Sequence, residues 1–238
     1  IEKSFDGRLR TENEPLTLSI DARMQHIMHT ALSDAMQTYS AIGASGVILD
    51  IKSGEVMSLV SLPDFDPYRP GKASENQLRN RSTLGVYELG SAFKIFTTAS
   101  ALDRGVVTMN GGYDATKPIR IAGHLIRDYH AKRRWLSVPE IFMYSSNIGA
   151  AKMAMAVGTN AQRKFLSSLG LLTPSPIELP EVGAPIKPKS WSTSTTMTVS
   201  FGHGIAVSSL QMASAVAACP PPITEMRALG HIHKKRGE

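Results

Sequence analysis

Ser91 and Lys94 are the two residues whose types and spacing point most directly to chemistry. They stand three positions apart after Gly90, at the start of an apolar stretch over residues 93–102 that we expect to form a buried helix. Residues i and i+3 of a helix share a face, so both side chains would point the same way. Burial would lower the pKa of the lysine, and its neutral amine would then accept the serine proton and create a nucleophile. The spacing alone leaves open an alternative, in which the serine caps the helix and the lysine amine reaches solvent.

A second polar pair, Ser145 and Asn147, lies where we expect a helix to break between two apolar segments. A hydroxyl and an amide on such a turn are suited to relaying a proton and to holding a carbonyl group. An ordinary helix break also carries such residues, so the pair gains weight only together with Ser91 and Lys94.

The elements that must position these residues follow from the periodicity of the apolar residues. A helical stripe predicts a helix over residues 21–37, and strict alternation predicts a β-hairpin over residues 43–61. Residues 1–16 are polar, and we expect them to be extended.

Later helices are marked by capping boxes, in which a serine or threonine is followed three positions on by a glutamate or glutamine. Such patterns begin at Ser137, Thr159 and Ser208, and we expect the helix after Thr159 to end at Gly170.

The composition restricts the function classes. The 238 residues carry a net charge of +6 that is scattered along the chain, and no nucleic-acid motif accompanies it, so we expect no nucleic-acid partner. No apolar run has the 18 or more residues, roughly, of a membrane-spanning helix. A single cysteine excludes an internal disulfide. His203, in the turn Gly202-His203-Gly204, has no acidic residue near it in the sequence, which favours a structural role over a catalytic one.

The sequence resembles the transpeptidase domain of class B penicillin-binding proteins, especially the septal cell-division type, whose motifs include S-x-x-K and S-x-N. Besides the Ser91 motif, the resemblance is carried by residues 15–21, 47–61, 62–67, 145–155 and 201–207. These stretches follow the family's order over residues 1–218. Leu89 stands where many members have proline, and Ala92 replaces a common threonine.

The resemblance implies an α+β fold of the penicillin-binding and β-lactamase-like transpeptidase type, with an antiparallel sheet and a helical subdomain. It implies a D,D-transpeptidase in which Ser91 attacks the penultimate D-alanine of a peptidoglycan stem peptide and Lys94 is the base. Ser145 would pass protons to and from the amines, and Asn147 would hold the amide of the acyl chain. A β-lactam would acylate Ser91 as a covalent inhibitor, and no metal or organic cofactor would be needed.

The resemblance also implies a place in the cell. The intact protein would be anchored in the bacterial inner membrane, would act in the periplasm, and would meet cell-division membrane proteins. We expect the anchor to be absent from this chain.

The family's third element is a Lys-Thr-Gly or Lys-Ser-Gly strand at the edge of the sheet, and we expect the chain to lack it. Lys189-Ser190-Trp191 has no glycine in the third position. Residues 219–238 do not resemble the family, and we interpret them as a disordered or out-of-frame tail behind a truncated domain, 1–218. The sheet would then be incomplete, with an uncovered hairpin face, and the chain a poor enzyme.

Three hypotheses therefore stay open. The chain is a serine D,D-transpeptidase, a catalytically dead fragment or binding module, or a hydrolytic relative such as a D,D-carboxypeptidase or β-lactamase.

Overall fold

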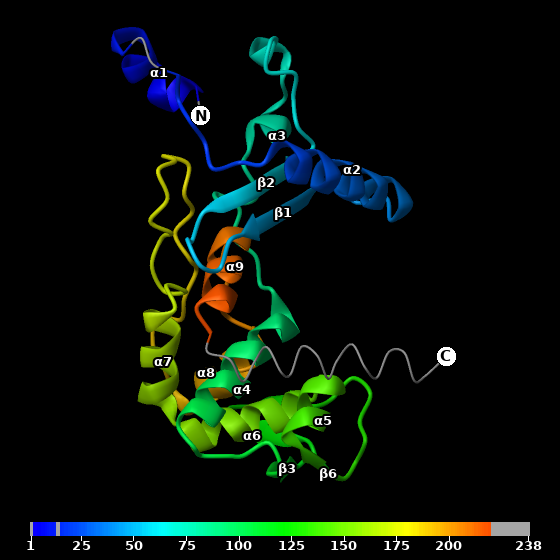
Figure 1. The fold of residues 1–238 in the computed structure, drawn as a ribbon. Coiled ribbons are helices and arrows are strands. Elements are labelled where there is room, and N and C mark those ends of the chain that lie inside the picture. Colours follow the sequence, from blue (N-terminus) through cyan, green and yellow to red (C-terminus); the bar gives the residue numbers. More distant parts are fainter. Residues whose placement is uncertain (1, 13–14, 220–238) are drawn as a thin grey trace. The chain divides into compact units, whose positions relative to one another are not determined.

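The computed structural model describes residues 2–12 and 15–219, which form two compact units (Figure 1). The first contains the described residues of Ile1–Tyr87, Thr173–Pro185 and Val207–Ala217. The second contains those of Glu88–Leu172, Ile186–Ala206 and Ala218–Glu238. All four candidate catalytic residues belong to the second unit.

The first unit contains the predicted hairpin, made of strands β1 (Ala44–Leu49) and β2 (Val56–Leu62). The strands pair antiparallel with Gly46 opposite Val60, and one irregularity falls at the end of β1. The prediction of a hairpin from alternating apolar residues is confirmed.

Helix α2 (Ala22–Thr38) packs on both strands and confirms the predicted helical stripe (Figure 1). Asp21 caps the helix, because its side chain accepts hydrogen bonds from two backbone N–H groups of the first turn. Gln25 attaches the helix to β2. Its Oε1 accepts from the Leu59 N–H at 2.9 Å, and its Nε2 donates to the Leu59 carbonyl at 2.8 Å.

Both faces of the hairpin are covered. Successive residues of a strand point to opposite faces. A Cβ on Gly46 would meet Met28 of α2, whereas the Ser45 hydroxyl lies 2.8 Å from that of Ser209 in helix α9 (Ser209–Ala217). The expectation of an uncovered face is therefore wrong, since the helices on each side of the strands supply the missing cover.

The start of the chain also differs from expectation. Helix α1 (Glu2–Thr11) replaces the expected extended segment. Two ion pairs at helical spacing support it, Asp6–Arg10 at 2.9 Å and Arg8–Glu12 at 2.6 Å. The remaining elements of this unit are the short helices η1 (Pro70–Lys72) and α3 (Glu75–Leu78).

The second unit is built around α4 (Lys94–Asp103), which continues from the 3₁₀ turn η2 (Gly90–Phe93). Helices α5 (Val138–Met143), α6 (Asn147–Val157) and α7 (Thr159–Ser168) pack against α4, and α8 (Thr193–Val199) packs on α6 and α7. Most of α4 is buried, from Phe96 to Ala101 without a break, so the predicted buried helix is confirmed.

Four short strands complete this unit. Strand β3 (Gly112–Asp114) pairs with β6 (Trp135–Ser137), and β4 (Ile119–Ile121) pairs with β5 (His124–Ile126), both antiparallel. Strand β6 leads into α5 through the predicted capping box, in which Ser137 and Glu140 bond each other's backbone. Buried residues of this region form one apolar cluster: Ala101, Ala115, Leu136, Val138, Ile141, Ile148 and Met153.

The capping box expected at Thr159 is wrong. Gly158 precedes α7, and no side chain caps its first turn. Gln162 points inward instead, where its Nε2 donates to the Thr196 carbonyl at 3.0 Å and its Oε1 accepts from Trp191 at 3.1 Å. The Gln162 side chain is therefore occupied by two partners in the core and does not cap the helix.

The other helix boundaries agree with prediction. Helix α7 gives way to Gly170, whose φ of +74° is left-handed. Ser208 caps α9, since its Oγ accepts from the Gln211 N–H at 3.1 Å.

Helices and small antiparallel sheets place the chain in the expected α+β class. Among the described residues, no helix is both long enough and apolar enough to cross a membrane. The interpretation of residues 219–238 as a tail concerns residues that, apart from Cys219, lie outside the described part of the chain.

Candidate active site

Ser91 and Lys94 lie on one face at the start of the central helix. The chain enters the helix through Gly90, whose φ of +52° is readily available to glycine. Ser91 is exposed in η2, whereas Lys94 is only 3% exposed. Lys94 Nζ lies 3.0 Å from Ser91 Oγ. The lysine amine is therefore buried beneath the serine. The capping alternative, which required this amine to reach solvent, is wrong.

Four oxygen atoms surround the Lys94 amine. They are the Ser145 carbonyl at 2.6 Å, Asn147 Oδ1 at 2.7 Å, Ser145 Oγ at 2.8 Å and Ser91 Oγ at 3.0 Å. An ammonium group fills three such positions with its N–H donors, and a neutral amine fills two and turns a lone pair to a third. The four oxygen atoms can therefore accommodate Lys94 in its protonated or its neutral form.

The burial of Lys94 changes its proton affinity. Desolvation lowers the pKa of Lys94 from 10.5 to about 8, while the negative charge of Asp128 acts in the opposite direction. A base works best when its pKa lies near the working pH. At neutral to mildly alkaline pH the amine can lose its proton and then accept the one on Ser91.

Ser145 lies on the predicted break between α5 and α6. Its φ of +54° is left-handed, which is uncommon for a residue other than glycine. Its Oγ donates a hydrogen bond to Ser91 Oγ at 2.9 Å. Ser91, Lys94 and Ser145 therefore form a closed triangle of polar atoms, with both hydroxyls exposed and the amine buried.

Asn147 is the first residue of α6, and its amide is oriented on both sides. Oδ1 lies 2.7 Å from Lys94 Nζ, and Nδ2 donates to the Arg127 carbonyl at 3.1 Å. An amide nitrogen carries two hydrogens. One of them remains to donate to a carbonyl group placed over Ser91.

Asp128 is a member of this site that the sequence analysis missed. Its carboxylate accepts hydrogen bonds from the Ser146 hydroxyl at 2.8 Å and from the Ile148 N–H at 3.0 Å. It belongs to no motif that we singled out. No signal in the sequence pointed to it.

The loop before Ser91 is held by the Gly202-His203-Gly204 turn. Glu88 Oε1 accepts from the Gly204 N–H at 3.0 Å, and Glu88 Oε2 lies 3.2 Å from His203 Nδ1. A Cβ on Gly202 would come within 2.1 Å of the Gly90 carbonyl oxygen, so the two backbones are in direct contact. His203 thus has an acidic partner, and both lie in a structural contact beside the serine loop.

Most of the chain matches the sequence model of a known protein family. Residues 44–219 fit the model of the penicillin binding protein transpeptidase domain. The chain belongs to this family. All four candidate catalytic residues lie within the matched range.

Relatives in the family include a probable peptidoglycan D,D-transpeptidase FtsI of Caulobacter vibrioides, 38% identical over 91% of this chain and 38% of its own length. Another is the peptidoglycan D,D-transpeptidase FtsI of Escherichia coli K12, 33% identical over 85% of this chain and 34% of its own length. The chain thus spans little more than a third of these curated relatives.

The fold of the family has been solved in similar chains. The transpeptidase domain of penicillin-binding protein 3 from Burkholderia pseudomallei, in its apo form, is 31% identical with a TM-score of 0.74, over 87% of this chain and 58% of that one. This similarity confirms the expected transpeptidase fold.

The expectation that the chain holds no Lys-Ser-Gly triplet is wrong, because Lys52-Ser53-Gly54 is one. It lies between β1 and β2, in a turn where Asp50 Oδ1 accepts from the Lys52 N–H at 2.7 Å. The resemblance implies a third motif on a strand at the edge of the sheet. This triplet precedes Ser91 and is part of a turn, so its sequence alone matches.

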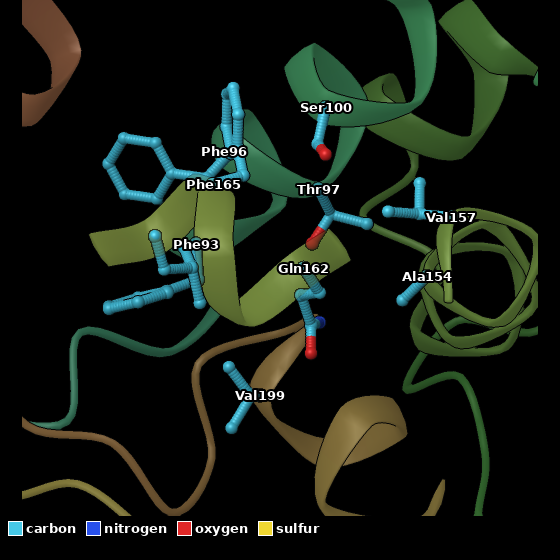
Figure 2. Close-up of a pocket in the computed structure, with 10 residues that line it drawn as sticks. Phe93, Phe96, Thr97, Ser100, Ala154, Val157, Gln162, Phe165 and Val199 are labelled. Atoms are coloured by element: carbon cyan, nitrogen blue, oxygen red, sulfur yellow. The ribbon is translucent and has the colours of Figure 1, made fainter. Parts of the chain in front are cut away.

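A small cavity lies on another face of the α4 region (Figure 2). Its walls include Phe93, Phe96 and Ser100, with Phe165 of α7 and Val199 of α8. It has room for about one water molecule. None of the four candidate catalytic residues lines it, so the cavity is separate from the site. In the described part of the chain, no three His, Cys, Asp or Glu side chains gather as a metal site requires.

Proposed function

We propose that this domain is a serine D,D-transpeptidase that cross-links peptidoglycan stem peptides through an acyl-enzyme on Ser91, and that β-lactams acylate the same serine. The observation that carries the proposal is the buried Lys94 amine, 3.0 Å from Ser91 Oγ and with a pKa lowered to about 8. The relatives named as peptidoglycan D,D-transpeptidases and the family membership support the choice of substrate.

Acylation begins with the neutral form of Lys94. Its lone pair takes the proton of Ser91 while Oγ attacks the carbonyl carbon of the penultimate D-alanine. A tetrahedral intermediate forms, and its oxyanion is stabilised by backbone N–H groups, which are unpaired in the first turn of a helix. The Ser91 N–H, in the first turn of η2, is one such donor.

Departure of the terminal D-alanine requires a proton on its nitrogen. Ser145 Oγ lies 2.9 Å from Ser91 Oγ and 2.8 Å from Lys94 Nζ, so it connects the protonated lysine with the leaving group. The Ser145 hydroxyl gives its proton to the departing amine and receives one from Lys94. The reverse transfer activates the amine of a neighbouring stem, which attacks the ester and releases Ser91.

Asn147 positions the acyl chain. Its Oδ1 and one of its Nδ2 hydrogens are occupied by Lys94 and the Arg127 carbonyl, which fixes the direction of the other hydrogen. That N–H donates to the amide carbonyl of the substrate beside the scissile bond.

We assign the same biological setting as the resemblance implies. The intact protein acts in the bacterial periplasm, anchored in the inner membrane, and works with cell-division membrane proteins. The FtsI names of the relatives support this setting.

A hydrolytic role is less well supported by the geometry. A hydrolase needs a base that activates water at the acyl-enzyme. Glu88 is the acidic residue nearest to Ser91 in sequence, and it directs both carboxylate oxygens to the His203–Gly204 turn.

The test is covalent labelling of residues 1–238 with a fluorescent penicillin, followed by mapping of the labelled peptide. We expect the label on Ser91, none in Ser91→Ala, and a severe loss in Lys94→Ala. Ser167→Ala, an exposed serine of α7 in the same unit, is the control and should label like the parent. Label that survives Ser91→Ala would reject the assignment. A folded chain that takes no label would favour the inactive binding module.

A further inference from the structure

Asp128 is a nearly buried carboxylate, 9% exposed, that faces the start of α6. Both of its oxygens are used. Oδ2 accepts from the Ser146 hydroxyl at 2.8 Å, and Oδ1 accepts from the Ile148 N–H at 3.0 Å. The Ser146 hydroxyl in turn accepts from the Gly149 N–H at 2.9 Å. A negative charge at a helix N-terminus is favourable, and here it bonds directly to the first turn.

Its neighbour in sequence holds the same turn. The Arg127 carbonyl accepts from Asn147 Nδ2 at 3.1 Å. Residues 127 and 128 thus bond to Ser146, Asn147 and Ile148 in succession. The strained backbone of Ser145 directly precedes these three, and such strain persists only where the surroundings fix it.

Asp128 also acts on the charge at the site. It bonds to Ser146 and Ile148, and the residues that alternate with them, Ser145 and Asn147, contact Lys94 Nζ. Its negative charge raises the pKa of Lys94. A buried ammonium is costly unless an opposite charge lies near it. The other charged residues on the helices packed with α4, and on α4 itself, are engaged elsewhere or exposed. Glu140 pairs with Arg134 at 2.6 Å and Lys152 pairs with Asp114 at 3.8 Å. The exposed residues are Asp103, Arg163 and Lys164.

We propose that Asp128 is a positioning residue of this active site, which fixes the turn bearing Ser145 and Asn147 and supplies the charge that balances the buried Lys94. The catalytic consequence rests on the proposed transpeptidase function. Without the carboxylate, Lys94 loses its proton more readily and becomes a weaker base for Ser91.

The experiment reads the titration of Lys94 directly and needs no acylation. Residues 1–238 are prepared with lysine labelled with ¹³C at Cε, and the chemical shift is followed by NMR against pH. The Lys94 signal is identified by its loss in Lys94→Ala. In Asp128→Asn, which is neutral and nearly the same size, we expect the midpoint to fall below about 8, because the charge that favours the ammonium is removed.

Ser146→Ala is the matched control. It removes the hydroxyl bond to Asp128 and the cap of α6 but keeps the carboxylate. We expect a lower melting temperature and an unchanged Lys94 midpoint. A merely structural Asp128 would give the same result in both variants.

An unchanged midpoint in folded Asp128→Asn would overturn the proposal. If that variant does not fold, Asp128→Ser, which is also neutral, takes its place. Failure of both neutral variants to fold would assign Asp128 to stability alone and would also overturn it. Failure of penicillin labelling alone would reject the proposed function and leave the Lys94 titration as evidence on Asp128.

Discussion

The rate at which a penicillin acylates Ser91 should follow the deprotonation of Lys94. With a pKa of about 8, the neutral amine makes up about one-tenth of the molecules at pH 7, half at pH 8 and nine-tenths at pH 9. We therefore expect the second-order acylation constant to rise roughly fivefold from pH 7 to 8 and to approach a plateau near pH 9, about tenfold above its value at pH 7.

The assay is the time course of fluorescent-penicillin labelling over pH 6.5 to about 9.5, corrected for the alkaline hydrolysis of the free β-lactam. An exposed lysine, with its ordinary pKa of 10.5, would give no plateau and a rise of about tenfold per pH unit throughout. Such a rise, or a rate independent of pH, would refute the buried base. Lys94→Ala should remove the titration from whatever rate remains.

Three further predictions concern residues around the site. Asn147→Ala should lower the melting temperature only slightly, through loss of the bond to the Arg127 carbonyl, and should slow acylation because a substrate donor is lost; a variant that unfolds would give Asn147 a structural role. Gly202→Ala should lower stability and acylation more than Gly204→Ala. Alanine at either position would be strained by about 1–3 kcal/mol, because both have a left-handed φ, but only a Cβ at 202 would meet the Gly90 carbonyl. Equal effects of the two substitutions in thermal melts and labelling would contradict this contact. Between pH 8 and 10.5, the free energy of unfolding of the parent should rise relative to that of Lys94→Met, because Lys94 keeps its proton in the unfolded chain and has lost it in the folded one. The rise over this range is roughly 3 kcal/mol. Denaturant unfolding that shows the parent losing stability relative to Lys94→Met would contradict the lowered pKa.

Part of the candidate site could be predicted from sequence, because the spacing of two residues within one segment determines their relative geometry. Ser91 and Lys94 share a helix face because they lie three residues apart, and the apolar residues around them predicted that the helix is buried. The same local logic gave the hairpin, α2 and the break at Ser145.

The contributions that no single segment determines were missed. Asp128 acts on residues that follow it by about twenty positions, beyond strand β6 and helix α5, so no local pattern reveals it. Glu88 and His203 meet only because the fold brings two distant loops together. Gln162 was assigned to a cap because the sequence contains no sign of the Thr196 carbonyl that it contacts.

Because the backbone of Ser145 is left-handed, a substitution at this position can raise stability while lowering activity. Glycine adopts this conformation without the steric cost that a side chain pays, so Ser145→Gly would relieve strain in the turn. The same change deletes the hydroxyl that links Ser91 to Lys94. A library selected for thermal resistance alone would therefore enrich glycine at 145, whereas one selected for β-lactam labelling would discard it. Variation at this position thus records which of the two properties a lineage or a screen has preserved.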